Sequence, residues 1–526
     1  MDDGLLLGVD VGTTNCKAIL FDISGRQVAS VHVPTPTIRP HPNWAEYDPE
    51  TLWETVAMAI RQVVGRVNPA RVRGVAAASM GESGVLLDER GRPLHPIVAW
   101  YDSRTVPQYR RWMDQVDTNA SFAIAGIRPE PIFGVYKLMW LRDHAPEAYA
   151  AAVRWLHVAD YIAFRLCGAQ ATDYSLATRT MLLDLRRRRW SDMLIARAGV
   201  RRDLLPELVS SGTRLGVVTD AAAAMTGLLA GTPVGSGGQD HVCGAFAAGV
   251  SEAGMCLDSM GTAEAVFLSL DAPVLDDERC RAGCTFGAHV ARDKYYTMDG
   301  LWTSGAAVEW ARSLLAWPES AVPHAGEDDL RSYARMEALA AQAPAGSLGV
   351  FFLPRLAGGD RGTFVGLTTD TGAAALGRAV YEGLAYEWRR YLETIESALD
   401  TQARTIRLIG GGIRSALWVQ IKADILGRPL HVLKVEESVA LGAALLAGIA
   451  AGVYHDEADA VAHLDHEERI VTPNTAHMAF YERCYREVYL RIAPALAGLH
   501  AAISDLPLAG DAPISESGVS QLNAKR

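Results

Sequence analysis

The chain has 526 residues, of which 49% are hydrophobic and 21% are charged, and its formal net charge is −11. This length exceeds what one hydrophobic core organises, so two large domains are expected. The acidic balance excludes the basic stripe that a nucleic-acid-binding surface needs.

The N-terminus, the most apolar segment and the cysteines bear on where the protein resides. The acidic start Met1-Asp2-Asp3 lacks the basic region of a secretory signal peptide. The apolar segment 440–454 is shorter than the roughly 20 residues that span a bilayer. Seven cysteines without paired spacing disfavour a disulfide framework. These features predict a reduced, soluble, cytoplasmic protein.

The first predicted elements are two strands joined by a Gly-Thr-Thr turn. Residues 5–22 read LLLGVDVGTTNCKAILFD, and a further strand is expected after the turn at Ser24-Gly25. P-loops and dinucleotide-binding fingerprints run from a strand into a helix, so this pattern excludes both. Convergent amides and hydroxyls in a tight turn favour phosphate oxygens, which makes Thr13 and Thr14 candidates for phosphate binding.

Two charged residues flank this turn. Asp10, just upstream, cannot bind phosphate directly but can hold a hydrated Mg²⁺ that bridges phosphate oxygens. Lys17, on the second strand, could add a positive charge. The alternative interpretation is a plain hairpin with incidental threonines, because glycine turns are common.

Halfway along the chain the same design occurs again. An amphipathic helix at 49–64 and a buried strand at 72–80 first indicate an α/β domain. Residues 254–270 then repeat strand, Met-Gly-Thr turn and strand, with Gly261 and Thr262 in the turn. Two copies suggest two domains of related architecture, whose loops could hold the β- and γ-phosphates of ATP from opposite sides of a cleft.

The expected domains are residues 1–249 and 250–500, followed by a flexible polar tail at 501–526. The second domain is expected to close with a strand at 405–412, a helix at 415–427, a strand at 429–435 and a small-residue helix from Ser438.

A glycine-flanked acid follows a short strand in VGSGGQDHVCGAF, residues 234–246. Asp240 would lie at the junction of that strand with a helix, where its side chain can point into a cleft. Phosphoryl transfer needs a positioned base for the acceptor hydroxyl, a role that suits Asp240. The alternative role, a helix N-cap, is equally compatible with the local sequence.

Together these segments resemble the FGGY family of carbohydrate kinases, within the superfamily of actin, sugar kinases and heat-shock-chaperone ATPases. GVDVGTTNCKAILFD and LDSMGTAEAVF resemble the two phosphate motifs, and GGQDH resembles the segment with the catalytic aspartate, here Asp240. LIGGGIRSALWVQIKADILGRPL followed by ESVALGAALLAG resembles the adenosine motif. The resemblance implies a two-domain α/β fold of the actin-like, sugar-kinase type, with a duplicated ribonuclease H-like motif and an interdomain cleft.

The resemblance also implies a set of nucleotide-binding residues. They divide between the first phosphate motif, the second phosphate motif, the segment LWTSGAAVEW and the adenosine motif. The candidates are Thr13, Thr14, Asn15, Lys17, Gly261, Thr262, Ser304, Gly305, Gly411, Gly412 and Ser415, with Asp10 for the metal.

The sugar side rests on SMGESGVLLDERGRPLHPIVAWYDSRT, which resembles the family's sugar-contacting strand and loop. Glu82 falls where glycerol kinases carry a polyol-binding glutamate; its alternative is a surface acid. The short loop after FFLPRL and the acid after the second Gly-Thr resemble the fuculose kinase branch, and xylulose kinases are also similar. The candidate substrate residues are Glu82, Trp100, Asp102, His241 and Glu264, with a salt bridge to Arg104 as the alternative for Asp102.

The expected activity is ATP-dependent and Mg²⁺-dependent phosphorylation of a terminal hydroxyl of a ketose, deoxyketose or polyol, with Asp240 as base. Small sugars are the expected partners, without nucleic acid or membrane, and a homodimer is a possible assembly. A non-catalytic nucleotide- or sugar-binding regulator on the same fold is the alternative, but Asp240 and both hydroxyl-bearing turns favour the kinase. A chaperone-type or filament-forming ATPase would need an extension that the short polar tail does not provide.

Overall fold

The computed structural model describes residues 4–315, 327–357, 361–504 and 506. Contacts between Cα atoms divide the chain into two compact units. Unit 1 comprises residues 1–253, 268–297 and 435–466, and unit 2 comprises residues 254–267, 298–434 and 467–526. The single domain boundary expected near residue 250 stays a prediction. The contacts place two later stretches, residues 268–297 and 435–466, with unit 1. The expected tail lies outside the described residues from 507 onward.

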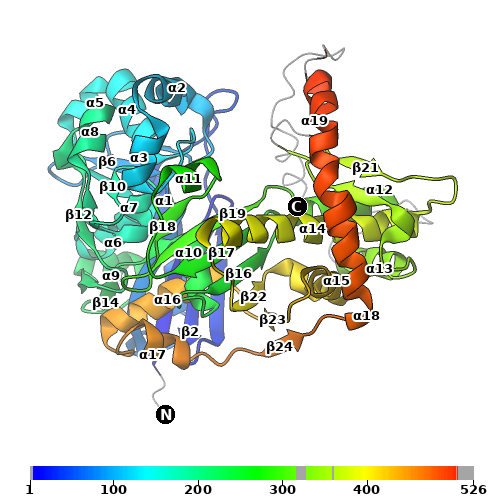
Figure 1. Ribbon diagram of the computed structural model, residues 1–526. Coiled ribbons are helices and arrows are strands. Elements are labelled where there is room, and N and C mark those ends of the chain that lie inside the picture. The colour runs from blue at the N-terminus through cyan, green and yellow to red at the C-terminus, as the bar shows by residue number, and fades with distance from the viewer. Residues whose placement is uncertain (1–3, 316–326, 358–360, 505, 507–526) are drawn as a thin grey trace. The chain divides into compact units, whose positions relative to one another are not determined.

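Unit 1 is organised around a seven-stranded mixed sheet (Figure 1). Its order is β13-β14-β5-β1-β2-β3, with β15 paired to β5. Strands β1, β5 and β15 are parallel, whereas β2 and β3 continue from β1 as an antiparallel meander. The predicted strand–turn–strand hairpin is therefore confirmed. The bounds are β1 Leu5–Val11, β2 Asn15–Asp22, β3 Gln27–Pro34, β5 Val72–Ser79, β13 Arg214–Val217, β14 Pro233–Gly235 and β15 Gly238–Gln239.

Helices and short strands surround this sheet. The helices are α1 Pro49–Val64, α2 Val106–Gln115, α3 Thr118–Ala125, α4 Gly134–His144, α5 Pro146–Ala151, α6 Val158–Cys167, α7 Tyr174–Thr178, α8 Asp192–Ala198, α9 Asp220–Thr226, α10 Asp240–Ala247, α11 Asp277–Arg281, α16 Ser438–Ala451 and α17 Glu457–Ala462. The short strands are β4 Glu46–Tyr47, β6 Gly84–Leu87, β7 Ile97–Val98, β8 Arg154–His157, β9 Ala171–Asp173, β10 Leu183–Asp184, β11 Arg189–Trp190 and β12 Glu207–Val209.

Helix α16 packs on β1, β5 and α10 at very short range. A Cβ atom on Gly8 of β1 would lie 1.8 Å from the carbonyl oxygen of Ala440. One on Gly442 of α16 would lie 2.1 Å from the carbonyl oxygen of Cys243 in α10. The glycine- and alanine-rich sequence of α16 therefore serves close internal packing. In the part of the chain that the structure describes, no helix is long and apolar enough to cross a bilayer.

A second seven-stranded sheet has the order β18-β19-β17-β16-β22-β23-β24. Strands β16 and β22 are parallel, and the predicted repeat of strand, Gly-Thr turn and strand is confirmed as β16 and β17. Strand β18 and one end each of β17 and β19 count with unit 1. The strands are β16 Met255–Met260, β17 Glu264–Leu270, β18 Phe286–Ala288, β19 Tyr295–Leu301, β20 Phe351–Leu353, β21 Thr363–Val365, β22 Thr405–Ile409, β23 Leu430–Leu433 and β24 Glu468–Val471.

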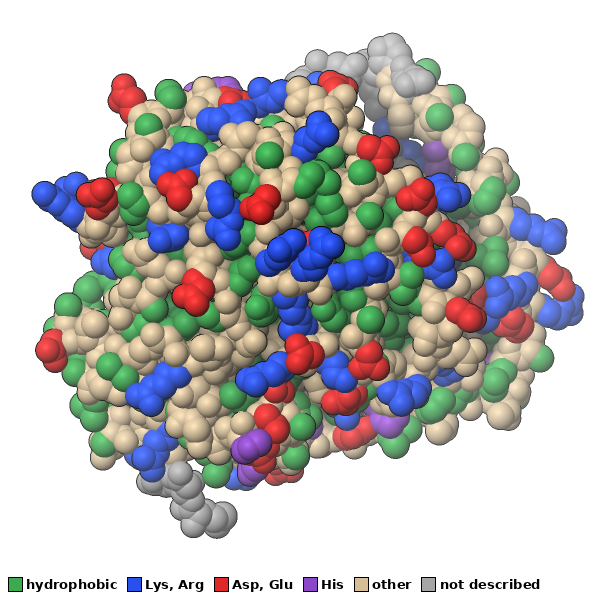
Figure 2. Space-filling model, turned by 60° about the vertical axis from the view of Figure 1, so that its left-hand side comes forward, with side chains coloured by type: hydrophobic (Ala, Val, Ile, Leu, Met, Phe, Trp, Pro, Cys, Tyr) green, Lys and Arg blue, Asp and Glu red, His purple; other side chains and the backbone are tan. Residues whose placement is uncertain are grey.

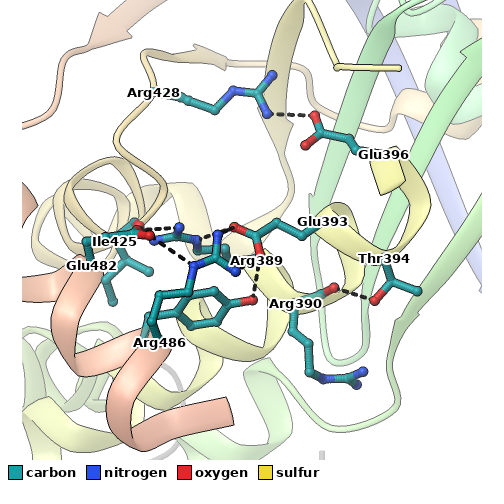
Figure 3. Close-up of polar contacts among 10 residues, drawn as sticks. Arg389, Arg390, Glu393, Thr394, Glu396, Ile425, Arg428, Glu482 and Arg486 are labelled. Carbon is teal, nitrogen blue, oxygen red and sulfur yellow. Dashed lines mark hydrogen bonds and ion pairs between the residues drawn. The ribbon is translucent and has the colours of Figure 1, made fainter. Parts of the chain in front are cut away.

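Helix α14 is the longest helix of unit 2, and an ion-pair network ties it to its neighbours (Figure 3). The Arg389 guanidinium donates to the carbonyl oxygen of Ile425 in α15 at 2.6 Å and to Glu393 at 2.8 Å, and it also pairs with Glu482 of α18. Arg486 pairs with Glu393 at 2.9 Å. The helices of unit 2 are α12 Gly305–Leu315, α13 Glu327–Ala340, α14 Ala373–Leu399, α15 Ala416–Leu426, α18 Thr475–Arg483 and α19 Leu490–Ser504, with a π-helix at Cys484–Tyr489.

Acidic and basic side chains are interspersed over the face that Figure 2 shows, with one group of lysine and arginine side chains near its centre. Apolar side chains lie scattered among them.

Both sheets with their helices give the α/β class that the sequence predicts.

Candidate functional site

The turn of the first hairpin is fixed by hydrogen bonds from two other segments, which contain Thr35 and Trp100. The Thr35 hydroxyl donates to the carbonyl oxygen of Gly12 at 2.7 Å, and the Thr35 amide donates to that of Thr14 at 2.9 Å. The indole N–H of Trp100 donates to Oγ1 of Thr13 at 3.0 Å. The predicted sugar-side residue Trp100 therefore contacts the predicted phosphate-side turn. The other candidates of this hairpin, Asn15 and Lys17, lie on β2.

Asp10 lies directly opposite Lys17 in the register of β1 and β2. The Lys17 ammonium is 3.7 Å from Asp10 but donates to Glu437 at 2.6 Å. Burial raises the pKa of Asp10 to about 7, and Asp240 and Glu437 act in the same direction against Lys17. Glu437 has φ of 53° at the start of α16, a left-handed conformation that is unusual for a residue with a side chain. This backbone turn brings a second carboxylate to the first hairpin.

Asp240 is the first residue of α10, directly after β15. Its Oδ1 atom accepts from the backbone amide of His241 at 2.7 Å and from the side-chain amide of Gln239. The N-cap function falls to Gln239, whose side chain accepts from Val242, so the alternative role of Asp240 as the cap is not observed. Burial raises the pKa of Asp240 above its ordinary value. The His241 side chain is exposed.

Three of the four acidic candidates of unit 1 lie at one edge of its sheet. Asp10 is near the carboxyl end of β1, Glu82 follows β5, and Asp240 follows β15. Because these strands are parallel, their carboxyl ends meet at the same edge, which is where α/β proteins bind ligands. Asp240 raises the pKa of Asp10, and Glu82 raises the pKa of Asp240, as neighbouring carboxylates do.

Glu82 is buried and ion-paired with Arg179, so it is not the surface acid of the alternative interpretation. Nε and Nη2 of Arg179 both donate to Oε1 of Glu82, the former at 2.7 Å. The guanidinium also lies over the ring of Phe133, 4.9 Å from its centroid. A Cβ atom on Gly81 would lie 2.5 Å from Cγ of Arg179 and 2.9 Å from Cγ of Gln239. Arg179 thus occupies space that the glycine leaves free.

Lys137 of α4 is a second buried cation in this region. Its ammonium donates to the carbonyl oxygens of Ile132 at 2.6 Å and of Trp100 at 3.4 Å. Burial lowers the pKa of Lys137 to about 8, against the opposing effect of Glu82. The loop that carries Trp100 is therefore fixed by a buried ammonium as well as by the contact with Thr13.

Asp102 forms the salt bridge with Arg104 that the alternative interpretation describes. Its Oδ1 accepts from the amide and Nε of Arg104 at 2.8 and 2.9 Å, and its Oδ2 accepts from Nη2 at 2.8 Å and from the amide of Ala45 at 2.6 Å. The same guanidinium pairs with Glu46 and lies 3.9 Å from the ring centroid of Trp44. Asp102 is thus engaged in holding two loops together, and a substrate role for it stays a prediction.

In unit 2, the start of α12 clamps the second Gly-Thr turn. The Gly305 amide donates to the carbonyl oxygen of Gly261 at 3.0 Å. The amides of Ser304 and Ala306 both donate to that of Thr262, at 3.0 and 3.1 Å. A Cβ atom on Gly305 would lie 2.5 Å from the Gly261 oxygen, so the approach requires glycine. These contacts bring together four of the predicted nucleotide residues.

A buried ionic cluster of Lys422, Asp258 and Glu264 lies next to the strands that flank this turn. The Lys422 ammonium of α15 pairs with Asp258 of β16 and with Glu264 of β17, and Glu264 also accepts from the Ser304 hydroxyl at 2.6 Å. Burial and the neighbouring Glu264 raise the pKa of Asp258 well above its ordinary value. This shift favours the protonated form of Asp258. Glu264, a predicted substrate residue, is thus engaged in structural contacts within unit 2, and its substrate role stays a prediction.

The predicted adenosine segment lies beside the second Gly-Thr turn, because β22 is parallel to β16. A Cβ atom on Gly410, whose φ is 95°, would lie 2.6 Å from the carbonyl oxygen of Met260. Gly411 is exposed, and added atoms there would meet open space. Ser415 caps α15 by accepting from the amide of Trp418 at 3.2 Å. Gly411 therefore presents backbone at the surface, whereas a Cβ atom on Gly412 would lie 2.9 Å from side-chain atoms of Met260 and Trp418.

Five ionic residues of these clusters are absent from the sequence-based candidates: Arg179, Lys137, Lys422, Asp258 and Glu437. Three of their ion pairs join residues far apart in the chain: 97 residues for Arg179 and Glu82, 164 for Lys422 and Asp258, and 420 for Lys17 and Glu437. Glu437 and Lys422 had a local indication, since both lie in segments that resemble the adenosine motif.

Comparisons with known proteins cover most of the chain. The model of the N-terminal domain of the FGGY family of carbohydrate kinases matches residues 5–247, and that of the C-terminal domain matches residues 257–451. An autoinducer-2 kinase from Yersinia pseudotuberculosis serotype O:3 (strain YPIII) is 31% identical over 497 residues, which are 91% of this chain and 92% of that protein. An L-fuculokinase from Escherichia coli O157:H7 is 29% identical over 480 residues, covering 90% and 98%. The crystal structure of a xylulose kinase from Rhodospirillum rubrum matches with a TM-score of 0.85 and 29% identity, covering 94% of this chain and 100% of that one.

Proposed function

The chain belongs to the FGGY family of carbohydrate kinases, and we propose that it transfers the γ-phosphoryl group of ATP to a terminal hydroxyl of a ketose, deoxyketose or polyol. The family resemblance inferred from the motifs is confirmed, as are the two-domain α/β sugar-kinase fold and the class of phosphotransferase with an alcohol acceptor. No observation favours the non-catalytic alternative.

Asp240 is the proposed general base. In the reaction, the acceptor hydroxyl loses its proton to the Asp240 carboxylate as its oxygen bonds to the γ-phosphorus, and the bond from that phosphorus to the bridging oxygen breaks to release ADP. A base is most effective when its pKa approaches the working pH, and burial raises the pKa of Asp240 in that direction. The amide of His241 and the side chain of Gln239 fix one carboxylate oxygen, which leaves the other for the acceptor.

Asp10 fits the role of a Mg²⁺ ligand. It is a buried carboxylate whose charged form is disfavoured by its surroundings, and a cation would stabilise that form. The Lys17 ammonium lies 2.6 Å from Glu437 but 3.7 Å from Asp10, so the ion pair of Asp10 is the longer one. Among the described residues no cluster of three or more potential metal ligands occurs, which suits a Mg²⁺ held mostly by water and phosphate oxygens. When bound, such an ion would neutralise part of the negative charge of the phosphates.

The nucleotide is proposed to use the two hairpin turns and the glycine segment of unit 2. Thr13 and Thr14 in unit 1, and Gly261 and Thr262 in unit 2, present amides and hydroxyls suited to phosphate oxygens. Gly411, Gly412 and Ser415 are proposed for adenosine, because they follow β22, which pairs in parallel with β16 just before the second turn, and Gly411 is exposed there.

The observation that carries the kinase proposal is Asp240 at the sheet edge where Asp10 and Glu82 also lie. The test is ATP consumption by the full chain with Mg²⁺ over ketopentoses, deoxyketohexoses, ketohexoses and polyols, beside Asp240→Asn. Turnover with one acceptor class and its loss in the variant are expected. Turnover that persists in Asp240→Asn would exclude Asp240 as the base, and no turnover with any acceptor despite bound ATP would refute the kinase proposal for these substrates.

A further inference from the structure

We propose that Arg179 is a substrate-recognition residue and that the Glu82–Arg179 pair selects a neutral acceptor with adjacent hydroxyl groups over an acceptor that carries a carboxylate. This inference rests on the proposed function, because it concerns the acceptor that Asp240 would deprotonate. It adds a residue, and a discrimination against anionic acceptors, that the motifs do not indicate.

Arg179 is placed beside the proposed base by the fold. It follows α7 directly, and the hydroxyl of Ser175 in that helix accepts from the amide of Gln239 at 2.9 Å. Glu82 and Arg179 both act electrostatically on Asp240, in opposite directions. The space over Gly81 is filled by the Arg179 stem, and Gly81 has no left-handed φ that would itself demand glycine. Steric room for Arg179 is therefore the reason for a glycine at this position.

The pair offers both kinds of hydrogen-bonding partner that a diol needs. Both hydrogen bonds from Arg179 to Glu82 end on Oε1, so Oε2 remains able to accept from a hydroxyl. A guanidinium has five N–H donors, and the Glu82 bonds use two of them. Tyr296 is a further neighbour of the guanidinium. One hydroxyl can donate to Glu82 while its neighbour accepts from Arg179.

The charge balance around the pair disfavours an anionic acceptor. The positive charge of Arg179 is already matched by Glu82 in a buried ion pair. Asp240 adds a negative charge when it acts as base, and Lys137 is committed to two carbonyl oxygens. An acceptor carboxylate would thus be desolvated beside the carboxylates of Glu82 and Asp240, while the two buried cations of this region, Arg179 and Lys137, already have partners.

The first experiment measures KM for the acceptor and for ATP in the full chain and in Arg179→Met, Arg179→Lys and Gly81→Ala. Arg188→Met is the matched control, because Arg188 also makes an ion pair and ring contacts in unit 1 but pairs with Asp293. Arg179→Met and Gly81→Ala should raise the acceptor KM about 10- to 100-fold, with the KM for ATP within about twofold, and Arg179→Lys should recover part of the loss. Equal changes in both KM values, or an unchanged acceptor KM, would overturn the proposal.

The second experiment uses Glu82→Gln, which leaves the Arg179 charge unmatched. The ratio of kcat/KM for an aldonate to that for the corresponding neutral sugar should rise about tenfold or more. A ratio that falls or stays constant would contradict the charge argument. Calorimetric titration of Asp240→Asn with the neutral sugar and the aldonate measures recognition without turnover. Selective binding of the neutral sugar there would support this inference even if the kinase assay failed, and equal binding would refute it even if the assay succeeded.

Discussion

The two Gly-Thr hairpins share one backbone design but treat their charges differently. In the first, the Lys17 side chain is 25% exposed, and it is shared between Glu437 and a more distant Asp10. In the second, Lys422 is fully buried and pairs tightly with Asp258 and Glu264. A partly exposed ion pair can rearrange at low cost, whereas a buried one resists any change that leaves a charge unpaired. We therefore expect the first hairpin to use its charges in the reaction and the second to use them to fix its shape.

The largest expected effect tests the chemical side of this comparison. Asp240→Asn should lower kcat by about 10²- to 10⁴-fold, because the amide cannot accept the acceptor proton. Asp258→Asn is the matched control, since an amide imitates the protonated carboxyl that burial favours there. Steady-state kinetics and thermal unfolding of both variants provide the measurement. A comparable loss of kcat in Asp258→Asn would show that the second hairpin also carries reactive charge.

The next effect concerns stability. Lys422→Met should lower the free energy of unfolding by about 3–5 kcal/mol, because it strands buried acidic groups without their cation. Lys17→Met should cost no more than about 1 kcal/mol, as expected for a partly exposed pair. Urea unfolding of both variants measures the difference. Adding Glu264→Gln to Lys422→Met should restore much of the stability, and its failure to do so would argue against charge as the cause.

A smaller effect follows from the buried Lys137. The pKa of Lys137 is lowered to about 8 by burial, against an ordinary value of 10.5, so between these limits the unfolded chain binds more protons than the folded one. Deprotonation of Lys137 should therefore make the free energy of unfolding increase as the pH is raised from about 8 to 10.5. Urea midpoints across that range should show the rise in the unaltered protein relative to Lys137→Met. Parallel pH profiles of the two proteins would refute the assignment.

The smallest expected effect is at Glu437, where backbone and charge can be separated. Glu437→Gly removes the strained left-handed side chain and should gain about 0.5–1 kcal/mol of stability relative to Glu437→Gln, which keeps the strain. Both variants release Lys17 and should change the KM for ATP in the same direction by a few-fold. Opposite changes in KM would show that the backbone conformation, and not the carboxylate, positions Lys17.

Local patterns made the hairpins, the α/β class and the position of Asp240 predictable. Alternating and continuous apolar runs define the strands, and a small-residue turn between them fixes each hairpin. Glu82 was found through its motif, but its partner Arg179 stands in a segment with no distinctive pattern. Lys422 lies within the segment that resembles the adenosine motif, on a largely buried helix, and only tertiary packing makes it the centre of a cluster.

The same reasoning explains the residues whose surroundings differ from expectation. Asp102 and Glu264 were candidates because carboxylates accept hydrogen bonds from sugars, a chemistry that serves equally well for ion pairs. Which of the two occurs depends on the cation that the fold brings near, here Arg104 and Lys422. No spacing in the sequence encodes that approach.

The place of α16 in the chain has a consequence for biosynthesis. This helix packs against β1 and β5, which are made from the first 80 residues, yet it begins only at Ser438. At 5–20 residues per second, a ribosome needs roughly 10–40 seconds to proceed from residue 253 to residue 451. Throughout that interval the nascent sheet lacks the helix that fits against Gly8. Residues 1–253 produced alone would remain in that state permanently, with the apolar face of β1 and β5 open to chaperones or to aggregation.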